Sequence, residues 1–185
     1  MIDDVILEAE DKMDKTVQFL QQELSGLRTG KANPALVDTI TVDYYGTPTR
    51  LRDIANISTP EPRLIVINPF DPSSLGLIEK AIVAANIGIT PMNDGRLIRV
   101  PIPELSEERR KDMVKMAGRV TEEQRVSVRN IRRDANDQIK GLQKNGDATE
   151  DDRDAGLEHI QKATDEHIKK MDEMLAAKEK DIMEV

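Results

Sequence analysis

The sequence predicts an α+β protein: an elongated antiparallel three-helix bundle with a small α/β domain, built on a mixed sheet, inserted between helix 1 and helix 2. We expect the two parts to form an L. Three observations favour this fold: helical periodicity at both ends of the chain, strand-like runs between them, and few aromatic residues. Aromatic residues make up 2% of the 185 residues, and Trp is absent. The aliphatic core that this composition implies suits closely packed helices.

The first helix is expected from Ile2 to about Thr29. Apolar residues recur there every seven positions, which is the spacing of a narrow stripe on one face of a bundle helix, at Ile6, Met13, Leu20 and Leu27. Gly30 and Pro34 follow as helix-ending residues. A lone helix cannot bury such a stripe, so further helices must cover it.

The middle of the chain, residues 31–103, contains most of the prolines and β-branched runs. We expect strands at 38–45, 63–68 and 96–103, with the GTPT sequence forming a turn after the first strand. A helix is expected at 73–86. Strand, helix and strand in this order indicate a crossover unit in a small α/β domain.

Helical patterning returns after Leu105. Ser106 can begin the second helix, Asn145-Gly146 can break it, and the third helix runs from about Asp151 to the end with Asp147 or Thr149 as its cap. The inward-facing residues are Met113, Ala117, Val120, Ile131, Ala135 and Leu142 on the second helix, and Leu157, Ile160, Ile168, Met171, Leu175 and Ile182 on the third.

These elements divide the chain into a bundle domain of residues 1–30 and 104–185 and a small domain of residues 31–103. Two linkers join them, near 30–31 and 101–104. Two adjacent linkers form a natural hinge between domains. The hinge residues are expected to be Gly30, Lys31, Pro101 and Pro103.

Composition excludes several classes of protein. The chain has no Cys, so it can form neither disulfides nor thiolate metal sites. No apolar run reaches the length of roughly 18 residues that a membrane span needs, and the acidic N-terminus is unlike a signal peptide. We therefore expect a cytoplasmic protein, a monomer, without contact with membranes.

No catalytic motif is recognisable, so we expect no enzyme activity, no cofactor and no metal. The sequence lacks GxSxG, GxGxxG and a complete phosphate-binding loop. His159 and His167 are eight residues apart, whereas helical metal ligands sit three or four apart, so we expect them at the surface or its boundary. Tyr44 and Tyr45 could stack on bases, but one packing inward and one facing out is the commoner arrangement.

Charge is unevenly distributed along an acidic chain of formal net charge -8. Residues 105–146 hold 11 basic and 7 acidic residues and form the only positive segment. On a helical wheel, one side of this segment collects Arg125, Arg129, Arg132, Asn136 and Lys140, and Arg133 widens the patch. Such a face can be a solvated surface paired with acids on neighbouring helices. The alternative is a phosphate-binding surface, because a guanidinium group can bind two phosphate oxygens at once.

Four segments resemble bacterial ribosome recycling factors. They are LRTGKANPALVD (27–38), VDYYGTPTRL (42–51), EERRKDM (107–113) and VRNIRRDAND (128–137). Their order and spacing and the total length also match that family. The resemblance implies a three-helix bundle joined by a flexible hinge to a small α/β domain, with an overall shape like transfer RNA.

The resemblance also implies a function. Members of the family enter the ribosome after peptide release and, with elongation factor G, which hydrolyses GTP, separate the subunits for reuse. The bundle then lies against large-subunit ribosomal RNA. The contact arginines of the family correspond to Arg28, Arg129 and Arg132, and we add Arg125 and Arg133 from the same basic segment. The family commonly has Arg where this chain has Lys31. Lysine keeps the positive charge, but it lacks the planar guanidinium that can donate to two phosphate oxygens at once.

A helical protein–protein adaptor, such as a chaperone-like coiled-coil protein, is the alternative. It would leave an apolar stripe exposed after the three helices pack. Binding to ribosomes separates the two hypotheses.

Overall fold

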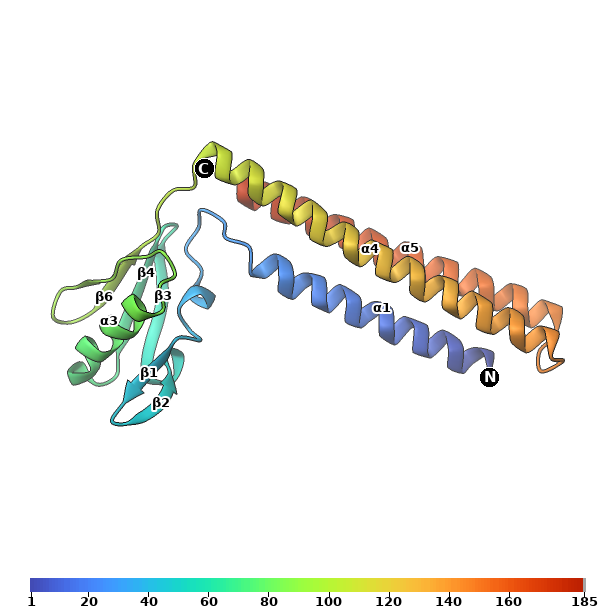
Figure 1. Cartoon of the computed structure of the whole chain (residues 1–185), viewed down its shortest axis with the longest axis horizontal. Helices are drawn as coiled ribbons and strands as arrows, with labels where there is room; N and C mark the ends of the chain where they lie inside the picture. Colours follow the sequence, from blue (N-terminus) through green and yellow to red (C-terminus); the bar gives the residue numbers. More distant parts are fainter. Residues whose placement is uncertain (185) are drawn as a thin grey trace. The chain divides into compact units, whose positions relative to one another are not determined.

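The computed structural model describes residues 1–184, and the last residue of the expected bundle segment, Val185, lies outside the described residues. The chain divides into two compact units. Residues 1–28 and 107–184 form the first unit, and residues 29–106 form the second (Figure 1).

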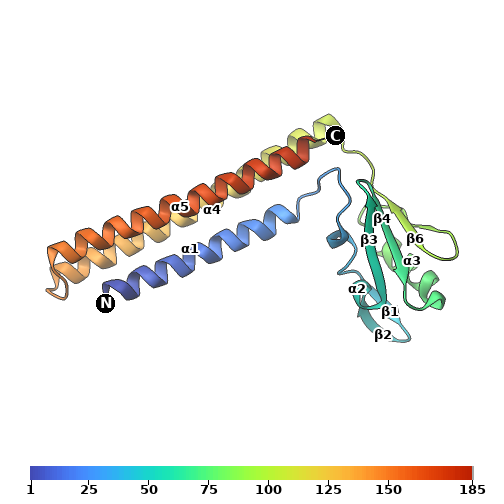
Figure 2. The ribbon, with the colours of Figure 1, turned by 180° about the vertical axis from the view of Figure 1, so that it is seen from behind.

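The first unit is a bundle of three long helices: α1 (Ile2–Ser25), α4 (Glu107–Lys144) and α5 (Glu150–Met183). Each helix contacts the other two. Consecutive helices run in opposite directions, as the views from both sides show (Figures 1 and 2). The predicted bundle with a small domain between its first two helices is therefore confirmed.

The bundle core follows the seven-residue spacing. Met13 and Leu20 of α1 are fully buried, while Ile6 and Leu27 lie at the edges of the core. The buried hydrophobic residues that α4 and α5 contribute are Ala117, Val128, Ala135, Ile139, Ile160, Ala163, Met171 and Ile182. At one point the helices pack closely, because a Cβ on Gly156 would lie 3.0 Å from Cγ2 of Ile2.

Helix α1 ends earlier than expected. It stops at Ser25 rather than near Thr29, so Arg28 lies in the connection that follows the helix. The hydroxyl of Ser25 donates to the carbonyl of Gln21, and Gly26 comes next. Serine side chains compete for backbone hydrogen bonds and glycine has low helix propensity, so this pair weakens the helix before Leu27.

The turn between α4 and α5 is closed by two capping motifs. Gly146 adopts a left-handed conformation at φ 82°, and the N–H of Asp147 donates to the carbonyl of Leu142 at 2.9 Å. This is the Schellman arrangement that ends helices. Thr149 then caps α5, and its side chain and that of Asp152 each accept a hydrogen bond from the backbone N–H of the other.

The second unit begins with a small hairpin, β1 (Thr41–Tyr44) paired with β2 (Thr47–Arg50). The expected strand at 38–45 and turn at GTPT are thus shifted. The turn is Tyr45-Gly46, with φ values of 50° and 80°. Two consecutive positive φ values are typical of the hairpin turn whose twist matches the strands. Tyr44 is half-buried and Tyr45 is exposed, as expected for adjacent residues of a strand end.

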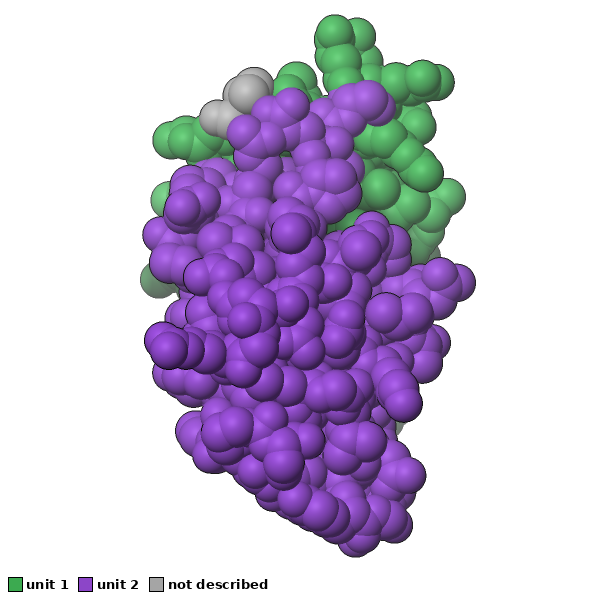
Figure 3. All heavy atoms as spheres, turned by 90° about the vertical axis from the view of Figure 1, so that its left-hand side faces the viewer, with its two compact units in different colours: residues 1–28, 107–184 green, residues 29–106, 185 purple. Residues whose placement is uncertain are grey.

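A four-stranded sheet forms the rest of this unit, whose atoms are purple in Figure 3. Its order is β3-β4-β6-β5, and every neighbouring pair among the described strands is antiparallel. The bounds are β3 (Ala55–Glu61), β4 (Leu64–Pro69), β5 (Met92–Asn93) and β6 (Ile98–Pro101). The predicted mixed sheet is therefore wrong. Helix α3 (Leu75–Ala84) leads from β4 to β5, and β6 then turns back between those two strands.

One aliphatic core holds the second unit together. The inward side of α3, at Leu75, Ile78 and Ile82, packs with fully buried residues of the sheet. Those sheet residues are Ile65, Ile67, Ile98 and Val100. Short helical turns complete the unit, at η1 (Pro34–Leu36), α2 (Leu51–Ile54) and η2 (Pro72–Ser74).

Candidate nucleic-acid interface

The site begins with the long helix α4, which presents four arginines along two helical turns. We call Arg125, Arg129, Arg132 and Arg133 the basic face. Their spacing of three and four residues places them on neighbouring positions of the helix surface. Among the described residues, these four side chains differ strongly in the number of carboxylate groups that pair with them.

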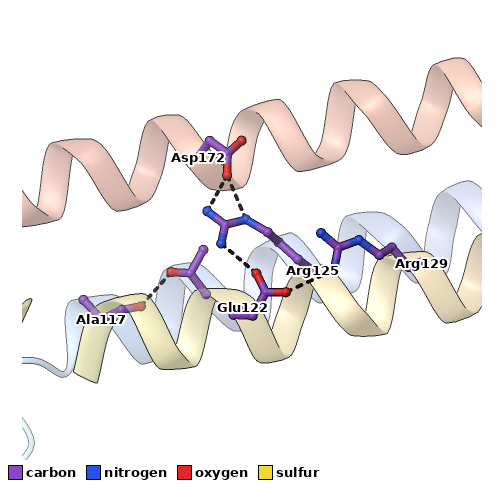
Figure 4. Close-up of polar contacts among 6 residues, drawn as sticks. Ala117, Glu122, Arg125, Arg129 and Asp172 are labelled. Carbon is purple, nitrogen blue, oxygen red and sulfur yellow. Dashed lines mark hydrogen bonds and ion pairs between the residues drawn. The ribbon is translucent and has the colours of Figure 1, made fainter. Parts of the chain in front are cut away.

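The side chain of Arg125 is mostly covered by its neighbours in the bundle and is 19% exposed. Its Nε and Nη2 both donate to Oδ1 of Asp172 on α5, at 2.8 and 2.5 Å. Its Nη1 donates to Oε2 of Glu122 at 2.9 Å (Figure 4). Burial alone would lower the pKa of this guanidinium, but the two carboxylates outweigh it and the pKa is raised. Arg125 is therefore mostly covered and paired with acids, one of the two arrangements that the sequence allowed for this face, and it joins α4 to α5.

Glu122 lies between two arginines. One of its oxygens accepts from Arg125, and the other accepts from Nη1 of Arg129 at 3.0 Å (Figure 4). The pKa of Glu122 is lowered by the hydrogen bonds from Arg125 and Arg129, so the carboxylate is ionised at neutral pH. Arg129 remains 44% exposed.

Arg132 has a neutral partner. Its Nη1 donates to Oε1 of Gln161 on α5 at 3.2 Å, and the amide nitrogen of Gln161 donates to Asp165 at 2.8 Å. An amide oxygen orients the guanidinium without cancelling its charge. Arg132 therefore keeps a full positive charge near the junction of α4 and α5.

Arg133 and Arg28 are also exposed. No carboxylate among the described residues forms an ion pair with Arg133. Arg28 lies on the connection after α1, beyond the helix in which the sequence placed it. The structure thus brings Arg125, Arg129, Arg132 and Arg133 together on α4, whereas Arg28 belongs to a separate segment.

The four predicted hinge residues fall in different surroundings. Gly30 and Lys31 lie in the connection between α1 and η1. Pro101 is the last residue of β6 and pairs with Leu64, so it belongs to the sheet. Pro103 follows β6, in a connection without helix or strand that reaches α4.

Both histidines of α5 contact carboxylates of α1. Nε2 of His167 lies 2.7 Å from Oδ1 of Asp14, and its Nδ1 lies 2.6 Å from the carbonyl of Ala163. His167 is buried, at 6% exposure, which the sequence did not predict. His159 contacts Glu10 in the same way at 2.8 Å. Both pairs connect α5 to α1. Across residues 1–184 there is no cluster of three or more side chains suited to holding a metal ion.

Sequence reasoning allowed for acids on neighbouring helices but did not identify the individual acidic and amide partners of the basic face. Glu122 was within reach of a sequence reading, because it stands three residues before Arg125 and seven before Arg129. Asp172 and Gln161 were not, because they lie on another helix and only its packing against α4 brings them close.

Comparison with known proteins identifies the family of this chain. Residues 20–183 match the family described as ribosome recycling factor. The chain belongs to the ribosome recycling factor family. A curated ribosome-recycling factor of Staphylococcus aureus (strain JH9) is 52% identical over 182 residues, covering 98% of this chain and 99% of that protein. The counterpart in strain Newman shows the same identity and coverage.

Solved structures of the same family agree over nearly the whole chain. A solution structure of the ribosome recycling factor is 40% identical, with a TM-score of 0.80, and covers 100% of this chain and 98% of that chain. A second structure is 41% identical, with a TM-score of 0.67 and 99% coverage of both chains. That structure comprises models for the T. thermophilus ribosome recycling factor and the E. coli elongation factor G bound to the E. coli post-termination complex.

This ribosome recycling factor family member is a translation factor. Residues 1–184 include no helix with the length and apolar character needed to cross a bilayer.

Proposed function

We propose that this protein binds the post-termination ribosome and, together with elongation factor G and GTP hydrolysis by that partner, splits it into subunits for recycling. Family membership over nearly the whole chain supports this role. So does the relative that is described with elongation factor G on a post-termination complex. The observation that contributes most from this chain is the basic face of α4, which keeps uncancelled positive charge at Arg132 and Arg133 on an otherwise acidic protein.

The bundle docks on large-subunit ribosomal RNA through these arginines. Arg132, Arg133 and Arg28 contact phosphates directly, because no described carboxylate forms an ion pair with Arg132 or Arg133 and because all three lie at or near the surface. Arg129 joins them by exchanging Glu122 for a phosphate. Arg125 stabilises the part of the bundle that carries the other arginines, since its donor groups already form hydrogen bonds with Asp172 and Glu122.

The two units act as separate bodies in this mechanism. The bundle domain, 1–30 and 104–185, stays docked while the small domain, 31–103, moves under the force that elongation factor G applies. The connections near 30–31 and 101–104 serve as the hinge. Support comes from the division of the chain into two compact units and from the lack of helix or strand at 26–33 and 102–106.

The chain itself performs no covalent chemistry in this scheme and needs no cofactor. Its contribution is mechanical: it occupies the site where intersubunit RNA bridges form and transmits motion. It works as a monomer in the cytoplasm, where ribosomes and elongation factor G are found.

A subunit-splitting assay tests the proposal. Post-termination ribosomes are mixed with the protein, with and without elongation factor G and GTP, and free subunits are followed by light scattering. Splitting that requires all three components supports the function. Intact ribosomes in the complete mixture would refute it, and failure to co-sediment with ribosomes would favour the helical adaptor.

A further inference from the structure

The surface of α4 places one carboxylate between two arginines of the basic face. Glu122 accepts from Nη1 of Arg125 at 2.9 Å and from Nη1 of Arg129 at 3.0 Å (Figure 4). Two other acidic residues of α4 lie next to members of this group in the sequence, Glu123 beside Glu122 and Asp134 beside Arg133, and neither forms an ion pair with an arginine of the basic face in the described residues.

The two arginines do not depend on Glu122 equally. Arg125 already has a full negative charge beside it, because Asp172 accepts from its Nε and its Nη2. Arg129 has no other carboxylate partner in the described structure. The charge of Glu122 is therefore the one that offsets Arg129, and the free protein presents Arg129 in a largely neutralised form.

This neutralisation is easily reversed. The side chains of Glu122 and Arg129 are 51% and 44% exposed, and ion pairs between exposed side chains are weak. When Arg129 turns to a phosphate, Glu122 keeps its hydrogen bond to Arg125, so the displaced carboxylate is not left without a partner. The exchange from carboxylate to phosphate thus requires little rearrangement of the bundle.

A carboxylate at this place also repels phosphates that approach it. A phosphate held in an optimal position by the neighbouring arginines overcomes that repulsion with several charge-assisted hydrogen bonds. A phosphate of flexible, unstructured RNA makes fewer such contacts, so the same repulsion is a larger fraction of its binding free energy.

We propose that Glu122 is a specificity-determining residue: it occupies Arg129 in the free protein and so weakens binding to generic RNA more than binding to the ribosome. The inference rests on the proposed ribosomal function. Selectivity for the ribosome then depends on a negative residue, Glu122, as well as on the arginines of the basic face.

The test compares Glu122→Gln with Glu123→Gln. Both variants remove one negative charge from adjacent positions of α4, but only the first removes the partner of Arg129. The probes are post-termination ribosomes and polyuridylate, and dissociation constants are measured over a series of salt concentrations. Melting temperatures are recorded to establish that both variants fold.

Glu122→Gln is expected to bind polyuridylate about two- to fivefold more tightly than wild type, the range of one exposed ion pair. Its salt dependence should steepen by about 0.7 in the log–log slope, as for one added phosphate contact on a single strand. Ribosome affinity should change less, and Glu123→Gln should show a smaller effect on both probes. In an Arg129→Ala background, Glu122→Gln should have no larger effect than Glu123→Gln.

Equal behaviour of the two glutamine variants would overturn the inference, because net charge alone would then explain the result. Weaker binding of Glu122→Gln to both probes would also overturn it and would make Glu122 a support that orients Arg129. Neither result affects the proposed function, which is judged separately by whether the wild-type protein binds and splits ribosomes.

Discussion

Arg132 provides the sharpest test of the basic face, because its removal should separate binding from stability. In the Arg132→Ala variant, the bundle loses a single hydrogen bond, from Nη1 to Gln161 at 3.2 Å. Gln161 is exposed, so water can replace the lost donor. A surface change of this kind costs within about 0.5 kcal/mol of unfolding free energy. We therefore expect a melting temperature within about 2 °C of wild type.

The effect on ribosome binding should be much larger. A charge-assisted hydrogen bond contributes about 1.5–3 kcal/mol, which corresponds to about a 10- to 150-fold increase in Kd. Loss of one phosphate contact should also reduce the salt dependence of log K against log salt by about 1. Arg132→Lys should fall between wild type and alanine, because it keeps the charge but cannot grip two oxygens.

The assay is equilibrium binding to post-termination ribosomes at several salt concentrations, followed by sedimentation. Lys15→Ala is the matched control, because it removes one exposed positive charge from α1, where Lys15 pairs with Asp11 at 2.6 Å. If Arg132→Ala bound like Lys15→Ala, long-range charge would explain the interaction. If it melted far below wild type, Arg132 would be a structural residue and the reasoning would fail.

Three further predictions concern the hinge, a helix cap and a loop carboxylate. Gly30→Pro should bind ribosomes but split them slowly, whereas Gly30→Ala should split normally, since a Cβ there meets nothing within 4 Å; normal splitting by the proline variant would contradict a moving small domain. Thr149→Ala should lower the unfolding free energy by about 1 kcal/mol and Thr149→Ser should restore most of it, measured by urea unfolding, because the hydroxyl accepts from the N–H of Asp152 at 3.1 Å. The backbone N–H groups of Leu97 and Arg96, with Arg99 nearby, lower the pKa of Asp94 from 3.8 to about 2, so its stabilisation is present above pH 3.8 and is lost as the pH falls towards 2. Asp94→Asn should therefore be less stable than wild type near neutral pH, with a gap that closes over that acid range, and a gap independent of pH would refute the assignment.

The long helices could be predicted from the sequence because their pattern is local and repeated. Met13 and Leu20 are buried where the seven-residue spacing placed them, and Thr149 caps α5 as one of the two candidates. The end of α1 was less predictable. Leu27 continues the apolar spacing, but Ser25 and Gly26 end the helix first, so periodicity alone overestimates its length.

The direction of the strands in the sheet could not be read from their order. Two strands joined by a helix are usually parallel when they are neighbours in a sheet. Here the short strand β5 comes between α3 and β6 in the sequence, and β6 pairs with β4 in the antiparallel direction. The hairpin turn was hidden because it uses Tyr45 at positive φ, a conformation that favours glycine and asparagine.

The site was predictable in its charge but not in its pairing. A helical wheel collects the arginines of α4, yet it cannot tell that Asp172 holds Arg125, since the two residues are 47 positions apart. Contacts between helices decide which guanidinium groups remain available, and those contacts depend on the depth and rotation of packing.

The placement of the tyrosines and of the long helices gives this protein two built-in optical signals, one for each unit. Its only tyrosines, Tyr44 and Tyr45, lie at the end of β1 and in the turn that follows it in the second unit, and it has no Trp. Intrinsic fluorescence therefore monitors the second unit, while far-ultraviolet circular dichroism is dominated by the three bundle helices. Denaturation followed with both signals, without any added label, can show whether the two units unfold together or separately.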